Sequence, residues 1–193
     1  MTATQSGSFA SVGMTGLGAL DRGHRERIAE ILVATNSFRD DEVDVALELF
    51  DESITNKSPD YEFVGVFATG SISPVRDRSP RFAQGDDADL IGYACYGASP
   101  GTLGTYDLYW IAVHPEHQGE GGGSRLLEEV ERRLRERAAR MLVVETSARI
   151  DYESTRRFYE RRGYAEHARL RDFYAWGDDR VIYAKKLTGG SSD

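Results

Sequence analysis

A glycine-rich turn between an apolar strand and an amphipathic helix constrains this chain more than any other segment. The strand ends at Val113, the turn reads Gln118-Gly-Glu-Gly-Gly-Gly-Ser124, and the helix continues through Leu126 and Leu127. Glycines have no side chain, so backbone N–H groups can converge on one ligand group. The first turn of a helix adds unpaired N–H donors and a partial positive charge. The segment therefore predicts a binding site for a phosphate or a pyrophosphate.

Two common phosphate-binding loops do not fit this turn. A P-loop ends in Gly-Lys-Ser or Gly-Lys-Thr, and the turn contains no lysine. A dinucleotide fingerprint that starts at Gly119 and Gly121 needs a third glycine where Ser124 stands, and the acidic strand end that should follow is missing. From the residues alone, a purely structural turn is the alternative that stays open.

Apolar periodicity on both sides of the turn predicts one mixed α/β domain. Helices are expected from about Asp21, over 40–53, from the turn to about 140 and over 154–162, and strands over 61–68, 90–97, 105–113, 141–146, 164–170 and 180–186. Consecutive strands indicate antiparallel pairing, whereas the strand–helix–strand unit over 105–146 indicates a right-handed parallel crossover. We expect the domain over 21–188, with flexible segments at 1–20 and 189–193 and a long loop at 69–89.

Composition and charge exclude several classes of protein. The net charge of −8 argues against nucleic acid as the main partner, because nucleic-acid-binding proteins usually carry a basic surface. No apolar run approaches the roughly 18 residues of a membrane span. Cys95 is the only cysteine, which excludes an intramolecular disulfide, and the first 21 residues lack the Lys or Arg of a signal peptide. We therefore expect a cytoplasmic protein with neither nucleic acid nor membrane as partner.

Several motifs in register resemble the GNAT superfamily of acetyl-CoA-dependent N-acetyltransferases. Gln118-x-x-Gly121-x-Gly123 is similar to the acetyl-CoA motif of that family. Val144-Glu-Thr-Ser147 and Arg157-Phe-Tyr-Glu-Arg-Arg-Gly-Tyr164 are similar to a later strand and to the "FYE-x-x-GY" helix. The resemblance is strong over 107–164 and extends to 22–187 in the order of elements. It implies an α/β (α+β) fold in which a mixed, mostly antiparallel sheet, flanked by helices, contains a central parallel pair of strands that splays apart.

The same resemblance implies acetyl-CoA as co-substrate. No metal is expected, because His114 and His117 are interrupted by Pro115 and have no third ligand nearby in the sequence. The pantetheine arm would insert between the splayed strands and pair with the backbone of Ile111, Ala112 and Val113. The residues that would wrap the pyrophosphate are Gln118, Gly119, Glu120, Gly121, Gly122, Gly123 and Ser124. Two residues depart from the family pattern: Glu120 stands where a basic or neutral residue is common, and Gly122 where an apolar residue is usual.

Acetyl transfer to an amine needs a base for the amine proton and an acid for the leaving thiolate. Glu145 is a carboxylate in an apolar strand, which calls for a partner or a purpose, and it aligns with the base of ribosomal-protein-type family members. Tyr159 is similar to the family tyrosine that reaches the CoA sulfur. Asp107 is the alternative base. Without a catalytic role, Glu145 would be a solvent-exposed residue at the rim of the sheet and Tyr159 would be a core residue. Tyr152 stands where many relatives carry Asn.

An aromatic and acidic segment over 172–181 is expected to form a loop between the last two strands. It is similar to a tyrosine-bearing hairpin that borders the acceptor in protein N-terminal acetyltransferases. Tyr174 and Trp176, and with them Asp107, are therefore predicted to bind the acceptor, and an aromatic and carboxylate site suits a cationic amine. The acidic run over 40–52 would attract the same cation, or is simply a solvated helix face.

We predict direct transfer of an acetyl group from acetyl-CoA to a primary amine of a small molecule or a protein N-terminus. One alternative is a CoA-binding sensor or regulatory module without turnover. Another is a structural protein whose acidic helix is its interface. The identity of the acceptor, the choice of base and the oligomeric state, a homodimer included, stay open at this point.

Overall fold

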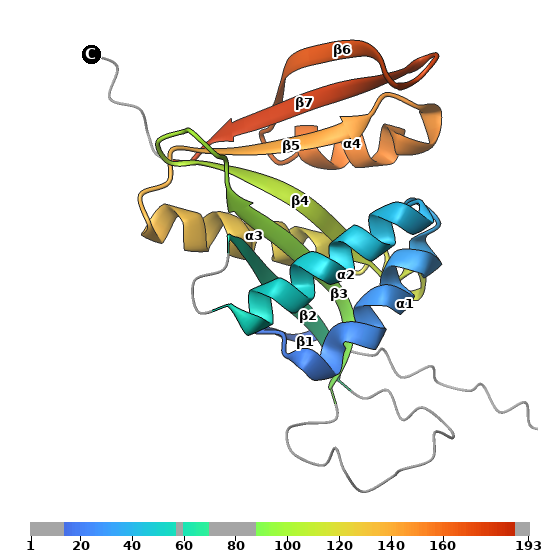
Figure 1. The fold of residues 1–193 in the computed structure, drawn as a ribbon, viewed down its shortest axis with the longest axis vertical. Helices are drawn as coiled ribbons and strands as arrows, with labels where there is room; N and C mark the ends of the chain where they lie inside the picture. Colours follow the sequence, from blue (N-terminus) through green and yellow to red (C-terminus); the bar gives the residue numbers. More distant parts are fainter. Residues whose placement is uncertain (1–13, 57–59, 70–87, 188–193) are drawn as a thin grey trace, which may run out of the picture.

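Seven strands form one mixed sheet in the computed structural model, which describes residues 14–56, 60–69 and 88–187 (Figure 1). The strands are β1 (Met14–Gly18), β2 (Tyr61–Thr69), β3 (Ala88–Ala98), β4 (Thr105–Val113), β5 (Met141–Ser147), β6 (Ala165–Ala175) and β7 (Asp178–Lys186). They lie in the order β1-β2-β3-β4-β5-β7-β6, and every neighbouring pair is antiparallel except β4 and β5. The predicted mixed α/β fold is thus confirmed.

Helices cover both faces of this sheet. They are α1 (Arg25–Thr35), α2 (Asp40–Thr55), α3 (Gly122–Glu136) and α4 (Glu153–Glu160), with short 3₁₀ turns η1 (Arg22–His24), η2 (Pro115–His117) and η3 (Ile150–Tyr152). The apolar side chains of α1 and α2 pack on one face, and those of α3 and α4 join a second core on the other face (Figure 1). None of the helices in the described part of the chain is both long and apolar enough to span a bilayer.

The parallel strands β4 and β5 pair along their first halves only. Thr105–Leu108 run beside Met141–Val144, after which β4 continues with β3 alone and β5 with β7 alone. Tyr109 forms a bulge in β4 at this point, because Leu108 pairs with Tyr96 while Trp110 already pairs with Cys95. A bulge bends a strand and increases its twist, so β4 turns away from β5 where their pairing ends. Two backbone edges without strand partners in the described residues therefore face each other across a gap.

The predictions for the chain ends and for the two loops have different outcomes in the structure. The segments 1–13 and 189–193 and nearly all of the 69–89 loop lie outside the described residues. β1 falls within the stretch for which we expected a flexible segment, because it adds to the edge of β2. The expected 172–181 loop is mostly strand: β6 and β7 run to a tight turn at Gly177, whose φ of 80° suits glycine.

Candidate active site

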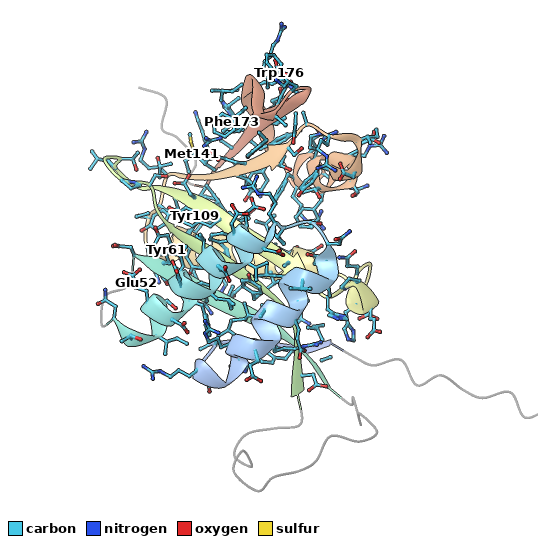
Figure 2. All side chains as sticks on the ribbon, turned by 45° about the vertical axis from the view of Figure 1, so that its right-hand side comes forward. Glu52, Tyr61, Tyr109, Met141, Phe173 and Trp176 are labelled. Carbon is cyan, nitrogen blue, oxygen red and sulfur yellow. The ribbon has the colours of Figure 1, made fainter. Side chains whose placement is uncertain are left out.

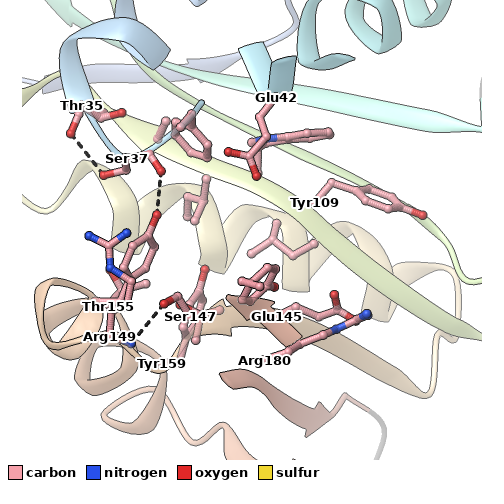
Figure 3. A pocket seen from close by; sticks show the side chains of 18 of the residues that line it. Thr35, Ser37, Glu42, Tyr109, Glu145, Ser147, Arg149, Thr155, Tyr159 and Arg180 are labelled. Atoms are coloured by element: carbon pink, nitrogen blue, oxygen red, sulfur yellow. Dashed lines mark hydrogen bonds and ion pairs between the residues drawn. The ribbon is translucent and has the colours of Figure 1, made fainter. Parts of the chain in front are cut away.

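A cavity of about 590 Å³ lies where β4 and β5 part (Figure 3). Its walls come from six parts of the fold: the α1–α2 connection with the adjoining helix ends, β4, the turn between η2 and α3, β5, the η3–α4 segment and the β6–β7 hairpin. The predicted site residues in its wall are Asp107, Ile111, Ala112, Val113, Gln118, Glu145, Tyr159 and Tyr174. Residues predicted from separate sequence motifs therefore meet in one cavity.

The glycine turn leads from this cavity into α3. Gln118 Nε2 donates to the backbone oxygen of Val113 at 3.0 Å, which ties the turn to the end of β4. Gly119 and Gly121 have φ values of 83° and 90°, a backbone conformation that glycine adopts without strain. Gly121 is the N-cap of α3, and no side chain caps this helix. The N–H groups of the first turn of α3 are therefore arranged as an anion site requires.

A fixed cation lies beside this helix start, and sequence reasoning missed it. The Arg162 guanidinium donates to Ser124 Oγ and, at 2.9 Å, to the oxygen of Phe158, and it stacks on the Phe158 ring at 3.7 Å. The signal was present in the two arginines that follow Phe158-Tyr-Glu. Glu120, the acidic departure in the turn, lies 3.3 Å from His117 Nδ1. The described residues contain no group of His, Cys, Asp and Glu placed to hold a metal ion.

Gly122, the second departure from the family pattern, occupies a site that has room for a methyl group. A Cβ there would lie 3.6 Å from side-chain atoms of Val113 and Val66, which is ordinary van der Waals contact. We expect Gly122→Ala to raise the free energy of unfolding by about 0.5–1 kcal/mol, because alanine loses less backbone entropy on folding. Its matched control, Gly121→Ala, should lower it by about 1–2 kcal/mol, because the left-handed backbone is strained for alanine.

Urea unfolding monitored by circular dichroism would measure both changes. Destabilisation by Gly122→Ala would show that the start of α3 is packed more tightly than the structure indicates.

Glu145 projects from β5 and forms an ion pair with Arg180 of β7 (Figure 3). The two residues are diagonal neighbours, because Glu145 pairs with Ile182 and Arg180 pairs with Ser147. The Arg180 guanidinium also lies over the Phe173 ring at 4.7 Å. The predicted base therefore has a fixed cationic partner that holds its carboxylate. Sequence analysis missed this partner because the register of β5 and β7 cannot be inferred from either strand alone.

Two further carboxylates in the cavity wall are held by hydroxyl groups. Ser99 Oγ donates to Asp107 Oδ2 at 2.5 Å, and Ser147 Oγ donates to Asp178 Oδ1 at 2.5 Å. Within the described ranges neither aspartate forms an ion pair with a basic side chain. Both carboxylates therefore lie in the cavity wall with a hydroxyl donor and, among the described residues, no ion-pair partner.

Tyr159 and Thr146 are buried residues with hydroxyl groups at the cavity wall. Tyr159 is 3% exposed, and burial raises its pKa well above the ordinary value, so the phenol stays protonated near neutral pH. In the described part of the chain Thr146 Oγ1 is buried without a hydrogen-bond partner, and Tyr159 lines the cavity beside this strand. An unpartnered buried hydroxyl costs free energy that a hydrogen-bonding ligand would recover. Both groups therefore fit a cavity built to hold a polar ligand.

The two aromatic residues predicted to bind the acceptor lie in different places. Tyr174 lines the cavity, and burial together with the charges of Asp178 and Glu42 raises its pKa. Trp176 is 95% exposed at the tip of the β6–β7 hairpin, outside the cavity wall (Figure 2). Of this pair, the structure thus brings only Tyr174 to the other site residues.

Comparison with known proteins identifies relatives of this fold. Residues 43–164 match the family model described as the acetyltransferase (GNAT) family. A crystal structure from Desulfovibrio desulfuricans, of a protein assigned to the GNAT family, is 39% identical with a TM-score of 0.73, covering 92% of this chain and 100% of that one. The search of curated proteins gave no match.

Two more distant structures show the same fold. The ribosomal-protein-S18-alanine N-acetyltransferase of Escherichia coli is 18% identical, with a TM-score of 0.62 over 92% of this chain and 97% of its own. A Salmonella typhimurium protein, solved with acetyl-CoA as its cofactor, is 17% identical, with a TM-score of 0.66 over 94% of this chain and 98% of its own.

Proposed function

This chain belongs to the GNAT acetyltransferase family, and on that premise we propose that it transfers the acetyl group of acetyl-CoA to a primary amine of a small molecule or a protein N-terminus. One observation carries the proposal. The glycine turn that leads into α3 reaches the cavity at Gln118, and the edges of β4 and β5 that have no strand partner among the described residues lie in its wall with the side chains of Glu145 and Tyr159.

The residues present fit acetyl-CoA at each part of the molecule. The pyrophosphate suits the glycine turn 118–124, where backbone N–H groups and Arg162 supply donors and positive charge. The amides of the pantetheine arm suit the open edge of β4 at Ile111–Val113, which has no strand partner on that side among the described residues. The acetyl-CoA bound to the Salmonella neighbour, which shares this fold, supports the same choice of cofactor.

When bound, acetyl-CoA supplies an activated acetyl thioester. Glu145 takes up a proton from the acceptor amine, directly or through one water, so that the nitrogen can form the new N–C bond. Arg180 holds this carboxylate at the cavity wall. As the C–S bond breaks, Tyr159 gives its proton to the departing sulfur and later regains one from solvent.

The acceptor that this cavity favours is a cationic amine. Asp107 and Asp178 present carboxylates that are held by serine hydroxyls and, within the described ranges, by no basic side chain, and Tyr174 adds an aromatic wall near Asp178. A carboxylate attracts an ammonium group, and an aromatic face contributes cation–π attraction. We infer that these acidic side chains attract the positively charged acceptor to the cavity.

The test is a screen of amines, polyamines, aminoglycosides and short peptides with free N-termini, with release of CoA as readout. We expect acetyl-CoA-dependent CoA release with at least one cationic amine. Calorimetry with acetyl-CoA accompanies the screen. Binding of acetyl-CoA without transfer to any acceptor would favour a CoA-binding sensor. Absence of binding would reject both the acetyltransferase and the sensor.

A further inference from the structure

A single phenol bridges the two walls of the cavity. The Tyr152 hydroxyl donates to the backbone oxygen of Ser37 at 2.6 Å, across 115 positions of sequence. Ser37 lies in the α1–α2 connection, and Tyr152 ends η3 and is the N-cap of α4. Both residues line the cavity, so the bond joins two separate segments of its wall.

The surroundings of both the donor and the acceptor favour this hydrogen bond. Burial and then the negative charge of Glu42 raise the pKa of Tyr152, so its hydroxyl remains a donor near neutral pH. The connection around Ser37 is fixed by its own bonds: Ser37 Oγ donates to Thr35 O at 3.1 Å, and Glu42 accepts from the N–H of Arg39 at 2.8 Å. The carbonyl that accepts from Tyr152 therefore has a defined position without any ligand.

The bridge lies at one end of the cavity. Figure 3 draws its Ser37 end beside Thr35, on the opposite side of the cavity from Tyr109, Glu145 and Arg180. The thioester must reach Glu145 for transfer, whereas the phosphates belong at the glycine turn before α3. An arm that joins these two places runs through the cavity between the parted ends of β4 and β5, whose wall includes both Ser37 and Tyr152.

We propose that Tyr152 is a positioning residue that closes this gap over acetyl-CoA, and that its bond to the Ser37 carbonyl must open for the pantetheine arm to enter or leave. The inference rests on the proposed function, because it assumes that acetyl-CoA occupies the gap. The bond forms without ligand, so it must open both when acetyl-CoA binds and when it dissociates. It makes the cavity a covered channel where an open groove would otherwise lie between the two walls.

Tyr152→Phe keeps the ring and removes the donor, and its effect is measured by stopped-flow binding of acetyl-CoA with the fluorescence of Trp110, a cavity residue, as readout. A single hydrogen bond shifts an opening equilibrium by about 2- to 12-fold. We therefore expect the association and dissociation rates both to rise about 2- to 12-fold. The Kd should change less than about 3-fold, because the bond closes the cavity with and without ligand.

Tyr183→Phe is the matched control, because it removes a phenol hydroxyl that donates to Glu160 outside the cavity wall, and its two rates should equal those of the wild type. A weaker Kd for Tyr152→Phe with an unchanged association rate would mean that Tyr152 only contacts the ligand. Unchanged rates in both directions would equally overturn the gate. Failure of the wild type to bind acetyl-CoA would instead reject the proposed function.

Discussion

Tyr159→Phe is expected to lower kcat for acetyl transfer at least about 100-fold while the Kd for acetyl-CoA stays nearly unchanged. The phenol is buried, its raised pKa keeps it protonated, and it lies at the cavity. The departing thiolate would lose its proton donor, whereas the bound thioester loses no contact of comparable strength. A 100-fold loss corresponds to about 2.7 kcal/mol of activation free energy.

Steady-state rates with a saturating acceptor and calorimetric binding of acetyl-CoA separate these two effects. Tyr183→Phe is the matched control, since Tyr183 packs 6.4 Å from Tyr159 in the same core and its hydroxyl donates to Glu160. It should keep the wild-type kcat. A Tyr159→Phe enzyme with the wild-type kcat would remove Tyr159 from the reaction and leave it as a core residue.

Glu145→Gln is the second change with a large expected effect. At neutral pH, kcat/KM should fall about 100-fold, because glutamine accepts the Arg180 hydrogen bond but cannot take up the amine proton. Without a base in the site, the reaction depends on acceptor that is already deprotonated. The kcat/KM of the variant should therefore rise as the pH approaches the pKa of the acceptor amine. The difference in kcat/KM between the variant and the wild type should become smaller over the same range.

The pH–rate profiles of Glu145→Gln and Asp107→Asn from about pH 6 to pH 10 make this comparison. Asp107→Asn should chiefly raise the KM of a cationic acceptor, because it removes a negative charge from the cavity wall. If Asp107→Asn lost kcat and Glu145→Gln did not, Asp107 would be the base and Glu145 a partner that orders Arg180.

Local patterns explain why much of the site could be predicted from sequence. The glycine turn, the amphipathic helix with Leu126 and Leu127, and the strand–helix–strand crossover depend on neighbours in the chain, so their residues reveal them. The family resemblance placed Glu145 and Tyr159 near that turn, and the structure brings both to one cavity.

The contacts that sequence could not supply depend on register and on distant packing. Arg180 meets Glu145 only because β5 and β7 pair with a particular offset. The bond from Tyr152 to Ser37 joins segments whose approach is set by the whole sheet. Trp176 was predicted to bind the acceptor, but it begins a tight hairpin turn and points to solvent, since strand pairing extends further than the acidic composition suggested.

The most direct measurement is a single turnover with acetyl-CoA that carries an isotopic label in its acetyl group, analysed by mass spectrometry. The protein is mixed with labelled acetyl-CoA and a cationic amine that is active in the acceptor screen. Direct transfer predicts the label on the amine nitrogen, one free CoA for each acetylated product, and no labelled acetyl group on the protein. Labelled protein that forms and decays at the rate of product formation would contradict direct attack, and bound acetyl-CoA that is never consumed would contradict transfer itself.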